Sequence, residues 1–235
     1  MEMYVSKLKL NPTPGLEPFR RAFDPDPGQA LDAHHRLIWT VFCDHEERER
    51  DFLFRQTGRT EFMSLSHREP VASPFFPNPD VRKVTLDFRA GDLVTFELRA
   101  NATKQITYED KKYRVDVVMN SLHDIPGVTV NPDMPESLRA KKRMSSAQIE
   151  GRKWLDRKGV QHGFEVQSLA IEDYRQNRLP KGNRGGSPQF SILDMIGDLR
   201  VTYPDAFTSV VVNGVGRAKA FGCGLFLVHK IRRRA

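Results

Sequence analysis

The sequence predicts an α+β protein in which two small domains of ferredoxin-like type follow one another along the chain. Patterns typical of strands and helices succeed each other in the order strand, helix, strands, helix, strands, helix, strand. The 235 residues are enough for two small cores, and the 39% hydrophobic content is ordinary for a globular protein. We expect an N-terminal domain at residues 1–103, an irregular insertion and linker at 104–143, and a C-terminal domain at 144–235.

The N-terminal domain is predicted to begin with a strand at residues 3–10, MYVSKLKL, where apolar and polar side chains alternate up to an Asn-Pro pair. Further strands are expected at residues 51–56, 61–67 and 92–100, the last from the alternation in DLVTFELRA.

A helix is predicted between the first two strands. Asp26 is a good N-cap and Pro27 suits the first helical position. Apolar residues and one histidine follow at spacings of four, three and four, which places them on one face that we expect to point inward. These residues are Leu31, His35, Ile38 and Phe42.

The C-terminal domain is expected to open with a helix at residues 145–158 whose inward residues are Ile149, Trp154 and Leu155. Two strand-rich segments, 164–171 and 187–202, flank the basic segment YRQNRLPKGNRGG, a pattern typical of a hairpin with a basic tip.

The end of the chain is expected to form a short helix and a final strand. Pro204 opens the helix, and Phe207, Val210 and Val211 follow it at helical spacing. The strand LFLVHKI comes after Gly224.

Charge indicates a polyanionic partner. Thirty-seven Lys and Arg residues face thirty Asp and Glu residues, which gives a net charge of +7, and the C-terminal half carries most of the excess. Residues 139–158 contain eight basic and two acidic side chains, and no acidic residue follows Asp205. The alternative is a basic surface with no polyanion bound to it.

The segment GVGRAKAFGCG, residues 214–224, has four glycines in the symmetric spacing G-x-G-x5-G-x-G. Such a loop holds a nucleotide cofactor, contacts an RNA backbone, or forms a tight turn. A dinucleotide-binding loop follows a strand and precedes a helix, whereas here a helix precedes and a strand follows; the GK[ST] ending of a P-loop is also lacking. We therefore expect an RNA-contacting loop and no nucleotide cofactor, with a tight turn as the alternative.

The sequence also predicts what the protein lacks. Cys43 and Cys223 are far apart and are expected to be small buried residues of a reduced, cytoplasmic protein. The histidines show no ligand spacing, so no metal site is expected. No signal peptide and no apolar run of membrane-spanning length is present, so we expect no membrane contact.

Five blocks, in this order, give the chain a family resemblance: MYVSKLKLNP, HHRLIWTVF, RDFLFR, FELRANATK and GVGRAKAFGCGL. Together they span nearly the whole chain and resemble the CRISPR-associated repeat-processing endoribonucleases, in particular the CasE (Cse-type) branch of the type I-E Cascade complex. The resemblance implies two ferredoxin-like (RRM-like) domains, binding of the CRISPR repeat RNA hairpin, and other Cascade subunits as partners. It further implies metal-independent cleavage at the 3′ base of the hairpin, which leaves a 2′,3′-cyclic phosphate and a 5′-hydroxyl on a product that stays bound.

Carried onto this sequence, the resemblance places the catalytic histidine at His35, next to His34. Some family members have a tyrosine three residues earlier, where this chain has Asp32, whose carboxylate we expect to pair with the imidazolium and raise its pKa. Lys219 is the candidate for stabilising charge in the transition state; the alternatives are a solvated lysine or a contact to the RNA backbone. For His35 the alternative is a histidine packed in the core.

The expected RNA ligands come from three places. The glycine loop supplies Gly214, Gly216, Arg217, Lys219, Gly222 and Gly224; the basic hairpin supplies Arg175, Arg178, Lys181 and Arg184; and the strand FELRANATK supplies Arg99 and Lys104. A non-catalytic, two-domain RNA-binding scaffold protein of a ribonucleoprotein would show the same charge and the same loop.

Overall fold

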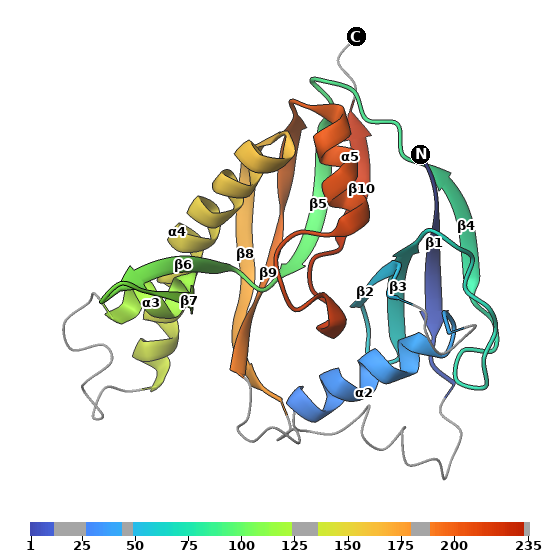
Figure 1. The fold of residues 1–235 in the computed structure, drawn as a ribbon, viewed down its shortest axis with the longest axis horizontal. Coiled ribbons are helices and arrows are strands. Elements are labelled where there is room, and N and C mark those ends of the chain that lie inside the picture. Colours follow the sequence, from blue (N-terminus) through green and yellow to red (C-terminus); the bar gives the residue numbers. More distant parts are fainter. Residues whose placement is uncertain (12–26, 44–48, 124–135, 180–188, 233–235) are drawn as a thin grey trace.

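The computed structural model describes residues 1–11, 27–43, 49–123, 136–179 and 189–232 (Figure 1). In these ranges the strands form two four-stranded sheets and a separate two-stranded hairpin, and every strand pair is antiparallel. The predicted fold class, α+β with two tandem ferredoxin-like domains, is confirmed.

The first sheet has the strand order β2-β3-β1-β4. The domain that contains it is made of β1 (Glu2–Lys9), α2 (Pro27–Trp39), β2 (Phe52–Gln56), β3 (Glu61–Ser66) and β4 (Asp80–Thr85). This is the ferredoxin-like order with no helix between β3 and β4. Apolar residues that alternate along β1 to β3 make one face of this sheet, against which α2 packs (Figure 1).

The second sheet has the order β10-β5-β9-β8. The domain that contains it is made of β5 (Leu93–Ala100), α4 (Glu136–His162), β8 (Phe164–Arg178), β9 (Gln189–Val201), α5 (Pro204–Asn213) and β10 (Phe226–Arg232). Two helices therefore alternate with four strands in the full ferredoxin-like βαββαβ order. The helix–loop–strand order predicted around the glycine loop is confirmed: α5, a single 3-10 turn η1 (Lys219–Phe221), then β10.

One domain boundary expected from the sequence is wrong. Residues 92–100 were expected in the N-terminal domain, but β5 pairs with β9 and β10 in the second sheet. The alternation of buried Val94, Phe96 and Leu98 identifies a strand correctly. It does not identify the partner strands, because these lie about a hundred residues further along the chain. The boundary between the two sheets therefore falls between β4 and β5.

The segment 104–143, expected to be irregular, contains regular elements where the structure describes it. They are the hairpin of β6 (Thr103–Tyr108) and β7 (Lys111–Asp116), the helix α3 (Val117–His123) and the first turns of α4. The hairpin was not predicted because almost none of its side chains is buried, so the sequence shows no apolar face there.

Helix α4 is longer than predicted, since it begins at Glu136. Trp154 and Leu155 are buried as expected, whereas Ile149 is 56% exposed. The helix predicted at Pro204 and most of the other predicted strands are confirmed, with strand ends within two residues, but β8 runs on to Arg178, seven residues beyond the strand predicted at 164–171. Strand β4, half of whose residues are charged, was missed.

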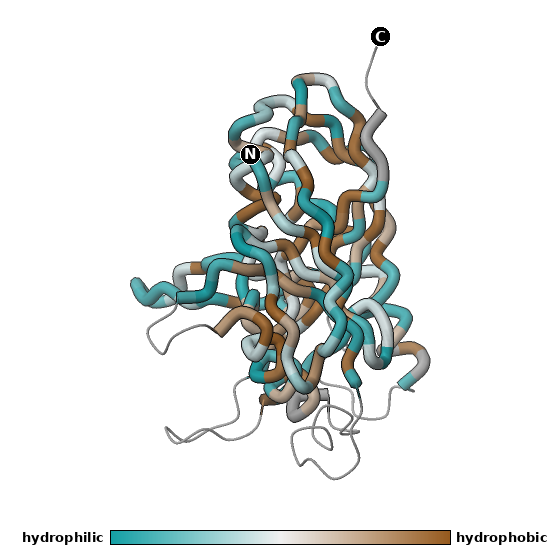
Figure 2. Tube along the Cα trace, turned by 90° about the vertical axis from the view of Figure 1, so that its right-hand side faces the viewer, coloured by the Kyte–Doolittle hydropathy of each residue, from teal (hydrophilic) through white to brown (hydrophobic). Residues whose placement is uncertain are grey.

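The core has two parts. One lies between α2 and the first sheet, and includes Phe54 and Phe62. The other fills the second domain and continues to Met3, Leu53 and Leu65 on the opposite face of the first sheet, which joins the two domains. Figure 2 shows the hydrophobic stretches along the inner strands and the hydrophilic ones along the periphery. Cys223 is buried as expected, and burial raises the pKa of its thiol to about 12, whereas Cys43 is exposed.

Candidate functional site

The two adjacent histidines of α2 have different surroundings. His34, which is 4% exposed, lies on the buried face and meets the edge of Phe62 with ring centroids 5.0 Å apart. His35 is half-buried beside η1, where its ring lies 6.1 Å from that of Phe221. The expectation that His35 points inward with Ile38 is therefore wrong. Its position one step round the helix directs His35 to the junction between α2 and the glycine loop.

A hydrogen bond fixes the imidazole of His35. The indole Nε1 of Trp39, one helical turn later, donates to Nε2 of His35 over 3.0 Å. A neutral imidazole has one donor and one acceptor nitrogen, so this bond leaves the proton on Nδ1. Trp39 is itself held by Phe52 of β2, edge to face at 5.0 Å. The sequence reasoning missed Trp39, although its i+4 spacing from His35 within HHRLIW was a usable signal.

The surroundings of His35 favour the uncharged ring. Burial lowers the pKa of His35, the cation of Arg50 lowers it further, and the opposing carboxylate of Asp32 does not offset them. As expected, the charge of Asp32 acts to raise this pKa, but the net shift is downward, and Asp32 does not pair with the imidazole. Instead, Asp32 makes an ion pair with Arg36 at 2.9 Å, one turn along the same helix.

Two cations accompany His35. Lys219 of η1 donates from Nζ to the carbonyl oxygen of Asn213 over 2.7 Å. Burial lowers the pKa of Lys219, and Arg50 lowers it further. Arg50 is also half-buried, which lowers its own pKa, and it makes no hydrogen bond or ion pair with the part of the chain described above. Arg50 opens the block RDFLFR that carries part of the family resemblance, but it was not proposed as a site residue, because nothing in its local spacing connects it to His35.

The glycine loop, residues 214–224, is shaped by contacts within the protein. All four glycines have positive φ, and a Cβ on Gly224 would lie 2.8 Å from the carbonyl oxygen of Val215. A Cβ on Gly214 would lie 2.9 Å from the side chain of Leu53 in the first sheet. These contacts support the tight-turn alternative for the glycines. The loop nevertheless leaves Arg217 exposed and brings Lys219 to the helix of His35.

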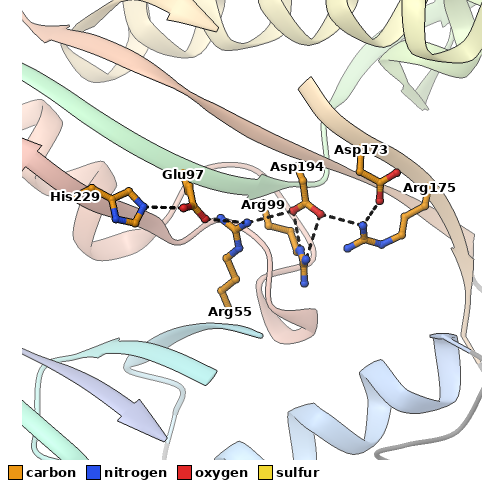
Figure 3. A network of polar contacts seen from close by, with 7 residues as sticks. All are labelled: Arg55, Glu97, Arg99, Asp173, Arg175, Asp194 and His229. Atoms are coloured by element: carbon orange, nitrogen blue, oxygen red, sulfur yellow. Dashed lines mark hydrogen bonds and ion pairs between the residues drawn. The ribbon is translucent and has the colours of Figure 1, made fainter. Parts of the chain in front are cut away.

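Two predicted RNA ligands, Arg99 and Arg175, belong to an ion-pair network between the domains (Figure 3). Arg99 binds Asp194 through Nε at 2.8 Å and Nη2 at 3.1 Å, and Arg175 reaches the same carboxylate at 2.9 Å. Burial tends to raise the pKa of Asp194, but the hydrogen bonds and charge of Arg99 outweigh it, so the pKa is lowered.

The network continues into the first domain through Arg55 of β2. Its side chain is 8% exposed and lies 3.3 Å from Glu97 of β5 and 3.6 Å from Asp194 of β9. Glu97 also contacts His229 at 2.9 Å. These ion pairs give Arg99 and Arg175 a structural role across the junction, and RNA contact by either stays a prediction.

The remaining predicted ligands are spread over the second domain. Arg178 is exposed at the last position of β8, and Lys104 lies on β6. Lys181 and Arg184 lie outside the described residues. The structure thus brings His35, Lys219 and the glycine loop together at one junction and leaves Lys104 on a separate hairpin.

Other features were searched for in the described ranges. No group of three or more His, Cys, Asp or Glu side chains there is arranged to hold a metal ion. None of the helices in those ranges has the length and apolar character needed to cross a membrane. A cavity of about 700 Å³ lies between the two sheets, lined by Val5, Leu65 and Leu227 among others, and none of its lining residues belongs to the His35 junction.

These features define a protein of two tandem ferredoxin-like domains with a histidine and a glycine loop at their junction. A family described as "CRISPR associated protein" matches residues 3–230, and the chain belongs to this family, as the five sequence blocks predicted.

Individual relatives are more distant. The CRISPR system Cascade subunit CasE of Escherichia coli (strain K12) is 25% identical over 228 residues, which cover 95% of this chain and 97% of that protein. The fold is similar to that of CRISPR endoribonuclease Cse3 bound to 19 nt RNA, with a TM-score of 0.66 at 21% identity over 98% of this chain and 100% of that one. It is also similar to Cas6e from Escherichia coli, with a TM-score of 0.58 at 22% identity over 96% and 98% of the two chains.

Proposed function

We propose that the protein is an endoribonuclease that matures CRISPR RNA. It binds the hairpin of the repeat in the precursor, cuts at the 3′ base of that hairpin without a metal ion, and keeps its product within a Cascade complex. The observation that carries the proposal is the half-buried, uncharged His35 beside Arg50, with Lys219 of η1 near the same Arg50 and η1 in contact with α2. Membership of the CRISPR associated protein family, and relatives named as a Cascade subunit and an endoribonuclease bound to RNA, support it.

In this proposal His35 is the base. A lowered pKa keeps the imidazole unprotonated at neutral pH, which is the form that accepts a proton. Nε2 carries the lone pair and is aligned by Trp39 in the free protein. When RNA enters, the indole yields Nε2 to the 2′-hydroxyl, whose proton moves to Nε2. The 2′-oxygen then bonds to phosphorus and the bond from phosphorus to the 5′-oxygen breaks. That oxygen takes a proton from water and leaves as a hydroxyl.

Arg50 and Lys219 supply the positive charge. Both are half-buried, so their attraction for a phosphate is screened less than that of an exposed cation. The phosphorane carries more charge on its non-bridging oxygens than the substrate does, and fixed cations stabilise that added charge. Lys219 is held by the carbonyl oxygen of Asn213, which is consistent with a prearranged site.

Recognition is assigned to the exposed cations near this junction. Arg178 lies at the end of β8, a strand against which α2 packs, and Arg217 lies in the glycine loop. Arginine binds phosphate and guanine edges in a bidentate manner, so both suit an RNA stem that enters between α2 and the second sheet.

The products of a repeat RNA test this function. With EDTA present, the protein is expected to cut a labelled repeat at one position and to leave a 2′,3′-cyclic phosphate, identified by mass spectrometry. A single 2′-deoxy nucleotide 5′ to the cut should abolish cleavage and preserve binding, because it removes only the attacking hydroxyl. Binding without any cleavage would instead support the non-catalytic RNA-binding scaffold. Cleavage of the deoxy substrate, or loss of cleavage in EDTA, would contradict the mechanism.

A further inference from the structure

The hairpin of β6 and β7 has one face built from aromatic and basic residues. In its register Tyr108 pairs with Lys111, Ile106 with Tyr113 and Lys104 with Val115. Opposed residues of an antiparallel pair share a face, and every second residue of a strand returns to it. We call this set the tyrosine face; it comprises Lys104, Ile106, Tyr108, Lys111, Tyr113 and Val115.

The outer part of the tyrosine face is open to solvent, whereas Lys104, Ile106 and Val115 nearer its base are half-buried. Tyr108 is 63% exposed and Tyr113 is 45% exposed, and both belong to the small group of large exposed hydrophobic side chains in the described ranges. Lys104 and Lys111 make no ion pair or side-chain hydrogen bond with any residue that the structure describes. Two exposed aromatic rings in adjacent register positions, flanked by unpaired cations, are typical of a surface that binds a ligand.

The base of the hairpin is held firmly against the second sheet. Asp116, the last residue of β7, accepts hydrogen bonds from the backbone N of Met119 at 2.7 Å and from the hydroxyl of Tyr174 in β8 at 3.0 Å. It also accepts one from Ser191 in β9. Burial and the charge of Asp116 raise the pKa of Tyr174, so that phenol stays protonated and keeps donating. The tyrosine face therefore has a fixed orientation relative to β8 and β9.

Apart from Asp116 at its base, the charged side chains on the two faces of the hairpin are all basic, and the acidic Glu109 and Asp110 are confined to the turn at its tip. Lys112 and Arg114 are exposed on its other face. Arg114 is close enough to α4 to help lower the pKa of Lys158, to which burial contributes most and Arg157 also contributes. On the tyrosine face itself both charged residues are lysines. A protein partner could bind the tyrosines through apolar contacts alone and would make no use of the lysines. In single-stranded RNA, bases that stack on aromatic rings alternate with phosphates that attract lysines, which fits this face.

We propose that the tyrosine face binds unpaired nucleotides that adjoin the repeat hairpin. Their bases stack on Tyr108 and Tyr113, and Lys104 and Lys111 contact the phosphates between them. Every base has a π-face, so this contact tolerates different sequences. In Figure 1 the hairpin projects from the second sheet on the side away from the first sheet, apart from the His35 junction. The inference rests on the proposed RNA function and adds a binding surface for the RNA outside the duplex.

The test compares two uncleavable 2′-deoxy repeat RNAs, one ending at the stem and one extended by unpaired nucleotides on both sides. We expect the wild type to bind the extended RNA more tightly. The change of Tyr108 or Tyr113 to Ala should weaken binding of the extended RNA by about 5- to 150-fold each, the range for one base stacked on an aromatic side chain, and leave the stem-only RNA unaffected. A change to Phe should preserve the affinity. Tyr203→Ala, at a tyrosine 71% exposed elsewhere, is the matched control.

Each contrary outcome has its own meaning. Equal affinity of the wild type for the two RNAs overturns this inference and leaves the proposed function standing. Tyrosine variants that weaken both RNAs alike, or neither, also overturn it, the latter in favour of a protein partner on this face. A wild type that binds neither RNA contradicts the proposed function itself. Thermal unfolding of each variant, expected to match the wild type because both side chains are exposed, shows that loss of binding is not loss of fold.

Discussion

Trp39→Phe removes one hydrogen-bond donor and little else. The phenyl ring retains most of the apolar surface that packs edge to face on Phe52 at 5.0 Å. What disappears is the N–H that donates to Nε2 of His35 over 3.0 Å. That bond exists only while Nε2 is unprotonated, since a protonated imidazole is a donor at both nitrogens. Its loss therefore destabilises the neutral form of His35 relative to the charged form.

The size of this effect follows from the net strength of one hydrogen bond, about 1 kcal/mol. That energy corresponds to a change of about fivefold in the protonation equilibrium, since each 1.4 kcal/mol is about tenfold. The direction is a rise in the pKa of His35 towards its usual value, because the bond acts in the same direction as burial and the Arg50 cation. The charge of Asp32, which opposes them, is unchanged by the substitution.

Proton NMR of the imidazole C–H signals against pH measures this effect in the intact protein without RNA. The His35 signal is assigned from its absence in His35→Gln. In Trp39→Phe the His35 midpoint should move to higher pH, while the other histidines serve as internal controls and stay in place. In cleavage assays the acidic limb of the pH–rate profile should move in the same direction.

Three results would refute this reasoning. An unchanged His35 midpoint in Trp39→Phe would show that the indole does not control protonation. A midpoint that moves together with those of the other histidines would point to a general change of structure. A loss of activity without any change in the pH profile would make Trp39 a packing residue.

Two further predictions concern the junction between the domains. Gly224→Ala should lower the free energy of unfolding, measured by urea titration, by about 2 kcal/mol or more. The reason is that φ is +93° and the new Cβ would lie 2.8 Å from the carbonyl oxygen of Val215. An unchanged urea midpoint of unfolding would contradict the close packing described for the loop. Asp194→Asn should lower the free energy of unfolding by about 3–5 kcal/mol at neutral pH, because three arginines lose a buried carboxylate. The variant should also lose less stability than the wild type when the solution is acidified. A lowered carboxyl pKa stabilises the fold above the usual Asp pKa, and that stabilisation is lost as the pH falls through the folded-state value. Equal acid sensitivity of variant and wild type would contradict this role of Asp194.

Much of the fold was predictable from local patterns. The alternation in MYVSKLKL and the spacing of Phe207, Val210 and Val211 identified a strand and a helix, because each pattern reflects burial on one side of its own element. The membership of β5 in the second sheet was not predictable in this way, since strand pairing joins residues far apart in sequence. The β6–β7 hairpin was missed because its side chains stay in solvent and form no apolar face.

The candidate site, like the fold, was predictable only where the signal is local in the sequence. The ordered motifs and helical position indicated His35 and the glycine loop, and the structure places them at one junction. The inward orientation was wrong because the helical face expected to hold His35 is occupied by its neighbour His34. The neutral state of His35 depends on Trp39 and on Arg50, and Arg50 reaches it only through the tertiary fold. The network of Arg99 and Asp194 likewise joins strands that are distant in sequence.

The central claim is that His35 carries the proton chemistry of a metal-independent cut. The most direct measurement is cleavage of a labelled repeat RNA by His35→Ala in EDTA, together with its affinity for the uncleavable RNA. The matched control is His229→Ala, which removes a histidine that contacts Glu97 in the ion-pair network and lies away from α2 (Figure 3). The account predicts that His35→Ala loses cleavage and retains nearly full affinity, while His229→Ala cleaves like the wild type. Cleavage by His35→Ala at the wild-type rate would contradict it.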